Sequence, residues 1–543
     1  MTDDGLETRA ASPSAPRPAT RQTDVVVIGG GVAGLVAALE CAKVGLRVTV
    51  LERRDGVGGC VGRIELDGLT LDSGAESFAT RGGAVAELLA SLGLDGDIEQ
   101  PNPAGAWLVM PGSNGDVDAA PMPRTGLLGI PANPLGDDVR RIIGWSGAVR
   151  AYADRLMPIL RIGRYRSLGH LVRSRMGRAV LDKLVTPISA GVYSTDPDVL
   201  DLDVVAPGLN QAMTRTGSLS GGVGQLVEAR KAGAAVLGLR GGMHRLVDAL
   251  AGELDRFGVE VVTGAEVTAL ARVADAGFET LASLAPQPAE GGLASLAPQP
   301  AEGGLASLAP QPSDLAPQPA DLAPRPAEGE AASLRVASKY VVVAAPADAA
   351  HRLIADASLG WAGDEEWPAA ASVELVTLVL DAPALDAAPR GTGVLVAAGT
   401  PGVTAKALTH STAKWSWLAD TARPRHVVRL SYGRAGAPNP LDGRSDEEVA
   451  ELALADASAL LGLPLDRTML RAAGRSAWRD ALSQATLGQR DRVRALEDAL
   501  AAEPGVEATG SWIAGTGLAS VVPHALEAAR RIRHLAVRPA ENA

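Results

Sequence analysis

Three glycines near residue 30 have the type and spacing to do chemistry in this 543-residue chain. Gly29, Gly31 and Gly34 form a Gly-x-Gly-x-x-Gly pattern. In such a pattern the first glycine permits a tight turn, the second lets the backbone approach a pyrophosphate, and the third lets a helix pack closely on a strand. A helix that begins here directs free N–H groups and about half a positive charge at the phosphates. The residues predicted to form this phosphate site are Gly29, Gly30, Gly31, Val32, Ala33 and Gly34.

Two predicted strands and the helix between them position these glycines. Residues 25–28 are β-forming and end directly at the first glycine, residues 35–39 continue with helical periodicity, and residues 47–51 form a second apolar run. Glu52 ends that run about 20 residues beyond the glycines, where a carboxylate accepts hydrogen bonds from ribose hydroxyls. Strand, turn, helix, strand and acid together predict that the chain binds a dinucleotide.

The residues that follow Glu52 indicate FAD rather than NAD. Arg53 comes next, a Gly58-Gly59 pair follows it, and a strand then ends in Asp72-Ser73-Gly74. This order resembles the FAD-binding start of the flavin amine oxidase superfamily, and dehydrogenases that use NAD do not usually carry it. A glycine-rich turn before an ordinary hairpin is the alternative interpretation.

A second glycine turn lies near the other end of the chain. Residues 510–522 are interpreted as a strand that leads into Gly515-Thr516-Gly517, and residues 525–532 continue as a helix. We expect the N-terminus of that helix to face the flavin ring. The first and last segments would then meet on one FAD, and the middle of the chain would build the substrate domain.

Length, composition and charge limit the class of protein. The chain is too long for one compact core, so two or three domains are expected, and 46% apolar with 21% charged residues is typical of a soluble globular protein. A net charge of -12 argues against nucleic acid as a partner. We find no secretory signal and no apolar run long enough to span a bilayer, and we therefore expect a cytoplasmic location with membrane contact at most peripheral.

The two cysteines, Cys41 and Cys60, cannot form a disulfide framework. Cys41 falls in the first predicted helix and is expected in the core. Cys60 follows the Gly58-Gly59 pair, and a small space-filling residue near the cofactor is favoured over a redox thiol.

A degenerate twelve-residue repeat begins at residue 281 and occurs again at residue 293. Each copy holds two prolines, which suit neither a helix nor a strand, so we interpret the repeat as a flexible insertion. Predicted strands at residues 259–270 and 334–337 flank it, so the insertion lengthens one surface hairpin. A neutral expansion is favoured over a binding role, which stays open.

Residues 140–184 carry eleven Arg or Lys side chains against only Asp154 and Asp182. Apolar residues between them, among them Leu156, Leu168 and Leu171, have helical spacing. Three interpretations stay open: solvated helix faces, a basic wall for an anionic substrate, or a face that rests on anionic lipid.

Taken together, residues from about 24 to 535 resemble the protoporphyrinogen/coproporphyrinogen oxidase family, with the repeat as an interruption. The string Pro-Ile-Ser-Ala-Gly-Val-Tyr-Ser-Thr-Asp at residues 187–196 is similar to this family in particular, and amine oxidases usually lack it. The similarity continues at residues 167–177 and 239–246 and at Lys414-Trp415. Two places depart from the family: Cys60 stands where a large or basic residue is usual, and residues 478–485 replace a usual Trp…Pro-Gln-Tyr pattern.

The resemblance implies FAD-dependent, six-electron oxidation of a porphyrinogen to a porphyrin in heme biosynthesis, with O2 reduced to H2O2 and a ferrochelatase as the expected recipient of the product. Because the flavin carries the chemistry, it implies no dedicated catalytic side chain and no metal. Coproporphyrinogen III, with four propionates, is favoured over protoporphyrinogen IX, with two, by the Arg-rich stretch, the missing membrane segment and the composition. A flavin amine oxidase or desaturase, and a non-catalytic FAD-binding scaffold that acts through the repeat, are the alternatives from other classes.

The resemblance also carries individual site residues over to this chain. The expected FAD contacts are Gly29, Gly30, Gly31, Val32, Ala33, Gly34, Glu52, Arg53, Gly58, Gly59, Cys60, Gly74, Ala75, Glu76, Ser77, Val267, Trp478, Gly515, Thr516, Gly517 and Leu518. The expected substrate contacts are Arg81, Val192 and Tyr193.

The expected fold is α/β: a Rossmann-like FAD-binding domain of the amine-oxidase type, an α+β substrate domain and a helical domain. The FAD-binding domain is predicted to combine residues 24–100, 231–355 and 476–535, with a disordered insertion at 276–333. Residues 101–230 are assigned to the helical and substrate part and residues 356–475 to the substrate domain, with tails at 1–23 and 536–543.

Overall fold

The structure is a computed structural model of the whole chain. It describes residues 20–112, 114–123, 126–158, 164–229, 236–273, 277–285, 333–357, 361, 367–368, 371–482 and 485–537.

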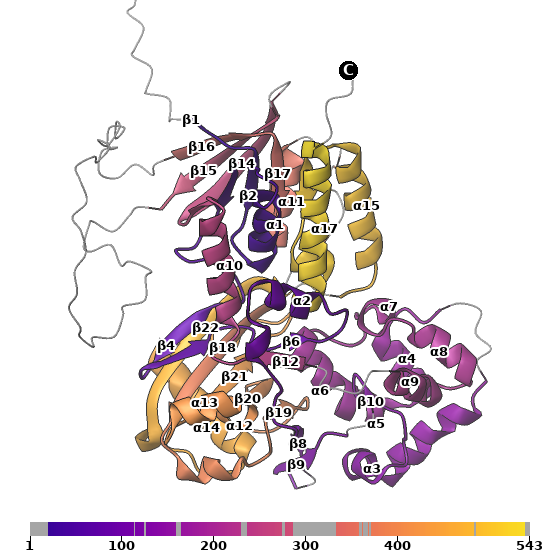
Figure 1. Cartoon of the computed structure of the whole chain (residues 1–543). Coiled ribbons are helices and arrows are strands. Elements are labelled where there is room, and N and C mark those ends of the chain that lie inside the picture. The colour runs from indigo at the N-terminus through magenta and orange to yellow at the C-terminus, as the bar shows by residue number, and fades with distance from the viewer. Residues whose placement is uncertain are drawn as a thin grey trace, which may run out of the picture.

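A five-stranded parallel sheet forms the centre of one part of the molecule (Figure 1). Its strands come from three distant stretches of chain and lie in the order β13 (Glu260–Val262), β3 (Val48–Leu51), β2 (Val25–Ile28), β17 (Tyr340–Val343) and β23 (Val506–Ala508). β2 is an unbroken apolar run that is buried on both faces, as a central parallel strand requires. The predicted strands at 25–28 and 47–51 are confirmed, the second as Val48–Leu51.

Helices cover one face of this sheet. Val25 and Val27 of β2 share a core with α1 (Val32–Ala42), α10 (His244–Arg256) and α17 (Leu518–Val537). Figure 1 shows these three helices beside one another. Cys41 lies in this core and is fully buried, as predicted, and burial raises the pKa of its thiol to about 12.

A four-stranded sheet covers the other face, together with α11 (Ala347–Asp356), α15 (Gln489–Ala502) and α16 (Ser511–Ala514). The strand order is β1 (Thr20–Gln22), β16 (Ser333–Ser338), β15 (Gly277–Leu284) and β14 (Ala265–Val273). β15 and β16 are antiparallel neighbours, so residues 286–332, which hold most of the repeat and lie outside the described residues, connect two strands of a hairpin. The hairpin itself is predicted, but its first strand is not: the sequence predicts a strand at 259–270, whereas β15 lies between β14 and β16.

Two predicted boundaries of this sheet are wrong. The sequence predicts the insertion at 276–333, but residues 277–284 form β15 between β14 and β16. Every second side chain of this strand, Phe278, Thr280 and Ala282, is buried in the core. The N-terminal tail was extended to residue 23, but Thr20–Gln22 pairs in parallel with β16. Residues 1–19 lie outside the described part of the chain.

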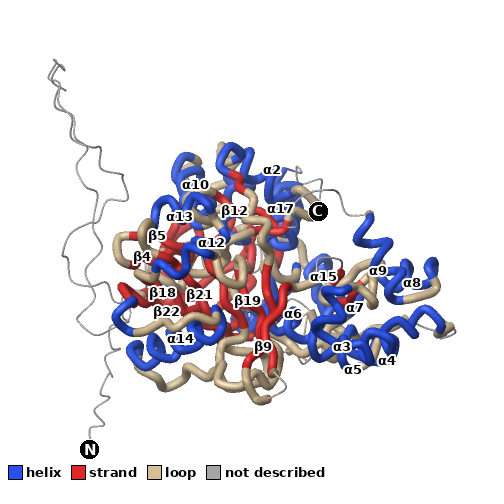
Figure 2. The backbone as a smooth tube through the Cα atoms, turned by 90° about the horizontal axis from the view of Figure 1, so that it is seen from below, coloured by secondary structure: helices blue, strands red, loops and turns tan. Residues whose placement is uncertain are grey.

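A mixed seven-stranded sheet forms the second part of the molecule. Its order is β22 (Leu470–Leu482), β18 (Ala371–Leu380), β21 (His426–Tyr432), β20 (Ala407–His410), β19 (Gly393–Val396), β8 (Ala106–Pro111) and β9 (Val117–Pro121). α14 (Asp446–Leu461) packs on one face, and α12 (Ser411–Lys414) with α13 (Ser416–Ala422) covers part of the other (Figure 2). Strand β22 runs across the boundary predicted at 475/476, and β8 and β9 join this sheet from the stretch assigned to residues 101–230.

Short helices form the third part, around a core of their own (Figure 1). They are α3 (Asp137–Tyr152), α4 (Leu168–Arg175), α5 (Arg178–Val180), α6 (Thr186–Ile188), α7 (Leu202–Val205), α8 (Leu209–Thr216) and α9 (Leu219–Glu228), with the single turns η2 (Ala153–Leu156), η3 (Leu181–Val185) and η4 (Ser189–Tyr193).

The smaller elements that connect the parts are β4 (Arg63–Leu66), β5 (Leu69–Asp72), β6 (Phe78–Ala79), α2 (Ala84–Ser91), η1 (Asp95–Asp97), β7 (Ile98–Glu99), β10 (Gly126–Leu127), β11 (Ile130–Pro131), β12 (Val236–Leu239), η5 (Pro383–Ala387) and η6 (Arg467–Met469). Among the described residues, no helix combines the length and the apolar character needed to cross a bilayer.

Candidate cofactor and substrate site

The turn between β2 and α1 has the geometry that a dinucleotide phosphate requires. Gly29 has a φ of +109°, and a Cβ at Gly34 would overlap the carbonyl oxygen of Gly29, so both positions need glycine. At Gly31, by contrast, a Cβ would meet no heavy atom within 4 Å. The backbone of Gly31 therefore borders open space at the N-terminus of α1, and the residues present fit a pyrophosphate there.

Glu52 lies beside this turn at the end of β3. Its carboxylate accepts hydrogen bonds from the backbone N–H groups of Gly30 (2.6 Å) and Arg54 (2.9 Å). The carboxylate is thus held next to the glycine turn, where a ribose would follow the pyrophosphate. Arg53 is exposed, and its guanidinium lies 4.0 Å from the carboxylate of Glu266. Val267, the next residue on β14, is buried in the core.

A second glycine loop packs directly against the first. The N–H of Gly58 donates to the carbonyl of Gly30 (2.7 Å), and a Cβ at Gly59 would lie 3.2 Å from the Cα of Gly31. The carbonyl of Cys60 then accepts from the N–H of Ala75 (2.9 Å), which ties this loop to the segment after β5. The Cys60 side chain is exposed.

Trp478 of β22, in the seven-stranded sheet, contacts the segment that follows β5. Its indole N–H donates to the carbonyl of Ser73 (3.0 Å), and the guanidinium of Arg54 lies 4.9 Å from the centre of its rings. A Cβ at Gly74 would approach the Trp478 ring to 3.3 Å. Residues predicted from opposite ends of the sequence therefore meet at one place.

The C-terminal glycine turn precedes α17, whose first residue, Leu518, shares a core with Val32 and Ala33 of α1. One prediction for this segment is wrong. The strand predicted at residue 510 lies earlier, at β23 (Val506–Ala508), because Gly510 has a φ of +123° and begins the short helix α16. Gly515 and Gly517 both have a φ of +92°, and Thr516 lies between them at the start of α17.

The predicted substrate residue Arg81 lies next to this turn. Its guanidinium donates to the hydroxyl of Ser520 in the first turn of α17 (2.5 Å). Burial raises the pKa of Tyr193, and the positive charge of Arg81 opposes that rise. Val192 precedes Tyr193 in η4 and is 55% exposed.

The side chain of Glu76 belongs to a buried ion cluster that the sequence does not reveal. Its carboxylate contacts the Lys414 ammonium (2.9 Å), the Arg429 guanidinium (3.2 Å) and the Ser411 hydroxyl (3.1 Å). Burial alone would raise the pKa of Glu76, but the charges of Arg429 and Lys414 outweigh it and lower that pKa to about 2. Arg429 also donates to the carbonyl of Gly74 (2.7 Å). Glu76 therefore fixes the 74–77 segment to the seven-stranded sheet, and its side chain points to these cations.

Lys406 is another buried charged residue that the sequence does not reveal, and it joins η4 to the seven-stranded sheet. Its ammonium donates to the Ser194 hydroxyl (2.6 Å) and the Gly433 carbonyl (2.7 Å), and only 2% of the residue is exposed. No carboxylate of the described chain forms an ion pair with it. Burial, with a smaller contribution from the charge of Arg434, lowers the pKa of Lys406 to about 7.

A cavity with a volume of about 1070 Å³ lies beside Trp478. Its walls come from β18, β22, β4 and the start of α14, and they include Glu65, Glu374, Arg434 and Arg475. Glu374 is paired with Arg475 and accepts a hydrogen bond from Asn439. Of the predicted residues only Trp478 borders this cavity, so Arg81, Val192 and Tyr193 lie at a different place.

Comparisons with known proteins agree with this architecture. A family described as flavin containing amine oxidoreductase matches residues 32–284 and 329–532. The chain is 24% identical to the coproporphyrinogen III oxidase of Bacillus subtilis (strain 168), over 91% of this chain and 94% of the relative. It is 27% identical to the coproporphyrinogen III oxidase of Mycobacterium tuberculosis (strain ATCC 25618 / H37Rv), again over 91% and 94%.

The solved structures that resemble the chain have the same fold. A candidate protoporphyrinogen oxidase from Exiguobacterium sp. 255-15 superposes with a TM-score of 0.72 at 22% identity, over 96% of this chain and 100% of the other. A putrescine oxidase bound to putrescine gives a TM-score of 0.56 at 17% identity, with 96% and 100% covered. The α/β fold and FAD as the cofactor, both predicted from the sequence, are confirmed. The chain belongs to the flavin-containing amine oxidoreductase family.

Proposed function

We propose that this protein oxidises coproporphyrinogen III to coproporphyrin III in heme biosynthesis, with FAD as cofactor and O2 as electron acceptor. The observation that carries the proposal is the match, over 91% of the chain, to relatives named coproporphyrinogen III oxidase. Two observations support it: the loops at 58–60 and 74–77 and Trp478 meet beside the Gly29–Gly34 turn, and Arg81 contacts the first turn of α17. When bound, FAD supplies a two-electron oxidation that is repeated three times per substrate, and O2 is reduced to H2O2 each time.

The chain's own residues hold the cofactor. The N–H groups at the starts of α1 and α17 would hold its phosphates and ring, and Glu52 would accept hydrogen bonds from its ribose. The loops at 58–60 and 74–77, together with Trp478, would hold the ring. Because hydrogen bonds fix the glycine turn, Glu52, the loops at 58–60 and 74–77 and Trp478 in place, this part of the site is preorganised before the cofactor enters.

Arg81 and η4 are proposed to hold the substrate. The Arg81 guanidinium can pair with a propionate carboxylate while it keeps its bond to Ser520. Val192 and Tyr193 offer an apolar edge and an aromatic ring to the macrocycle. A side-chain base is unnecessary, because a pyrrole N–H of the substrate can lose the compensating proton.

Protoporphyrinogen IX is the second candidate substrate. Protoporphyrinogen oxidase 1 of Arabidopsis thaliana is 27% identical, but over only 39% of this chain and 38% of the relative. Coproporphyrinogen III is favoured because the sequence relatives that match over nearly their full length carry its name. The Exiguobacterium protein also matches over its full length, but at 22% identity it supports the fold alone.

The test compares turnover of the two purified porphyrinogens, followed by porphyrin fluorescence and O2 consumption. We expect a higher kcat/KM for coproporphyrinogen III, and a strong preference for protoporphyrinogen IX would reverse the assignment. Anaerobic mixing with either substrate should bleach the bound flavin. A flavin that bleaches only with amines would indicate an amine oxidase, and one that bleaches with neither would indicate a scaffold.

A further inference from the structure

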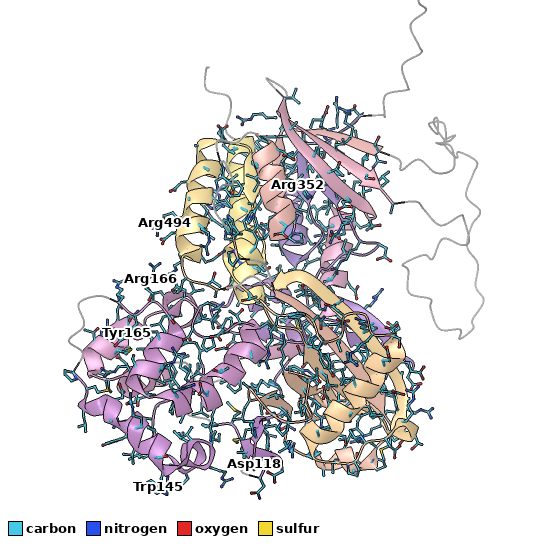
Figure 3. All side chains as sticks on the ribbon, turned by 180° about the vertical axis from the view of Figure 1, so that it is seen from behind. Asp118, Trp145, Tyr165, Arg166, Arg352 and Arg494 are labelled. Atoms are coloured by element: carbon cyan, nitrogen blue, oxygen red, sulfur yellow. The ribbon has the colours of Figure 1, made fainter. Side chains whose placement is uncertain are left out.

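The segment η4, which carries two of the proposed substrate contacts, is fixed to one end of the seven-stranded sheet. Three neighbouring strands contribute to this end: Leu395 belongs to β19, Lys406 directly precedes β20, and Gly433 directly follows β21. A Cβ at Gly191 of η4 would lie 2.7 Å from a methyl group of Leu395, so η4 packs closely on β19. Figure 3 shows the helical part beside this sheet, and η4 lies where the two parts meet.

Hydrogen bonds extend this contact from η4 to the chain that follows β21. The Lys406 ammonium donates to the Ser194 hydroxyl (2.6 Å) and to the Gly433 carbonyl (2.7 Å). The N–H of Ala435 donates to the Ser194 carbonyl (2.8 Å). Ser194, the residue after η4, has a φ of +54°, a conformation that is costly outside glycine and that these bonds stabilise. Arg434, between Gly433 and Ala435, is therefore fixed by its backbone beside η4.

The basic stretch predicted at 140–184 supplies part of its charge to the helical core. Arg175 is buried and its guanidinium contacts the buried Asp154 (2.6 Å), while Arg150 donates to two backbone carbonyls of α4. These two cations face no ligand. Arg434, by contrast, is exposed and borders the cavity beside Trp478, and it forms no ion pair with any carboxylate of the described chain.

The carboxylates of the same cavity wall leave this arginine unpaired. Glu374 and Asp446 both pair with Arg475. Glu65 and Asp442 form no ion pair among the described residues, and both are exposed to water, which screens their charges. The cavity wall therefore contains a cation that is available to an anionic ligand.

Lys406 adds a second positive charge that has no anion of its own. Only 2% of this residue is exposed. Burial is the main cause that lowers the pKa of Lys406 to about 7, and the charge of Arg434 lowers it further. Because like charges destabilise each other, a carboxylate that binds at Arg434 gains from both cations.

We propose that Arg434 binds a carboxylate of the porphyrinogen and thereby sets the preference for a substrate with four propionates. This inference rests on the proposed function. Arg81 is proposed to hold one propionate, which both candidate substrates can supply. Protoporphyrinogen IX has vinyl groups in place of two propionates of coproporphyrinogen III, and a guanidinium pairs with a carboxylate but gains no hydrogen bond from a vinyl group. Arg434 therefore distinguishes the two substrates.

The test uses the full-length FAD-loaded protein and measures kcat and KM for both porphyrinogens by porphyrin fluorescence. Arg434→Leu should raise the KM for coproporphyrinogen III about tenfold at nearly unchanged kcat, and should leave the KM for protoporphyrinogen IX as in the parent. Arg434→Lys, which keeps the charge, should recover part of the loss. Arg494→Leu is the matched control and should keep both KM values, because Arg494 projects outward from α15 in the cofactor-binding part (Figure 3).

Binding of the stable product coproporphyrin III gives a second measurement that does not depend on turnover. Titration of the FAD-loaded protein, followed by porphyrin absorbance, should show about tenfold weaker binding to Arg434→Leu than to the parent. Protoporphyrin IX should bind equally to the two proteins. Because Arg434 is exposed, circular dichroism and flavin content of the variant should match those of the parent.

Two results would overturn the inference: an unchanged KM for coproporphyrinogen III in Arg434→Leu, or an equal rise of KM for both substrates. In either case a parent protein that prefers coproporphyrinogen III leaves the proposed function intact. A parent protein that prefers protoporphyrinogen IX would overturn the proposed function and this inference together.

Discussion

Arg81, Lys406 and Glu76 show how single side chains connect the parts of this molecule. Each uses its charge across an interface: Arg81 reaches α17, Lys406 joins η4 to the seven-stranded sheet, and Glu76 ties the 74–77 segment to Arg429 and Lys414. The charges of Glu76 and Lys406 have left water, which is costly unless the charge is matched, so these two positions respond strongly to substitution. Arg81 is exposed.

Arg81→Leu should raise the KM for coproporphyrinogen III by about 10- to 100-fold with a smaller effect on kcat, because a substrate carboxylate loses a charge-assisted hydrogen bond. Steady-state kinetics on the two variants Arg81→Leu and Arg81→Lys measure this, and the lysine variant should fall between. Arg494→Leu removes an exposed arginine of α15 and serves as the control. An unchanged KM in Arg81→Leu would remove Arg81 from the substrate site.

The free energy of unfolding should depend on pH through Lys406. Its pKa is about 7 in the folded state and near 10.5 in the unfolded chain, so between these values the unfolded state binds the extra proton. Stability therefore rises with pH in this window, by up to about 1.4 kcal/mol per pH unit from this group, and below pH 7 the full cost is present.

Urea denaturation of the parent and of Lys406→Met between pH 7 and pH 10 measures this contribution, because the variant lacks the group and should show a shallower rise. Lys339→Met, at an exposed position, is the control and should keep the slope of the parent. Equal slopes in the parent and Lys406→Met would mean that the buried amine keeps an ordinary pKa.

At the scale of elements, two glycines of the β2–turn–α1 unit have different roles, one in folding and one in cofactor binding. Gly34 permits the contact between helix and turn, while Gly31 faces the open space in front of them. Two chemically identical substitutions, only three residues apart, should therefore act on different properties.

Gly34→Ala should lower the free energy of unfolding by about 1–3 kcal/mol or more, because its methyl group overlaps the Gly29 carbonyl. Gly31→Ala should leave the melting temperature of the flavin-free protein nearly unchanged and weaken FAD binding at least about tenfold, because the methyl group occupies the space of the pyrophosphate. Thermal unfolding of the apoprotein and titration with FAD separate the two effects. Equal FAD affinity in Gly31→Ala and the parent would place the pyrophosphate elsewhere.

The local parts of the fold could be predicted from the sequence, and the distant contacts could not. The strand, glycine turn and helix at 25–42 follow from neighbouring residues, as does the acid at Glu52. The partners of Glu76 lie more than 300 positions away, at Lys414 and Arg429, and no local pattern indicates them. β1 was missed because Thr20–Gln22 is polar and gains its structure only by pairing with β16.

At the scale of the whole molecule, the repeat connects two strands whose ends are adjacent, since Ser283 pairs with Ser333. Replacing residues 286–332 with a four-residue turn should leave flavin content and turnover unchanged. For a flexible connection, the shorter loop should raise the free energy of unfolding by about 2 kcal/mol. Denaturation and turnover of this deletion variant test both statements, and a loss of turnover would give the repeat a functional role.

The parallel sheet receives its outer strand, β23, and one of its covering helices, α17, from residues that are synthesised long after β17 and α1. Until the ribosome has made these residues, the outer edge of β17 and the part of α1 that contacts α17 lack those partners. An open strand edge of this kind invites pairing between unfinished chains. The sheet is therefore complete only after β23 and α17 have been made, and chaperones that bind extended apolar segments should engage the chain until then.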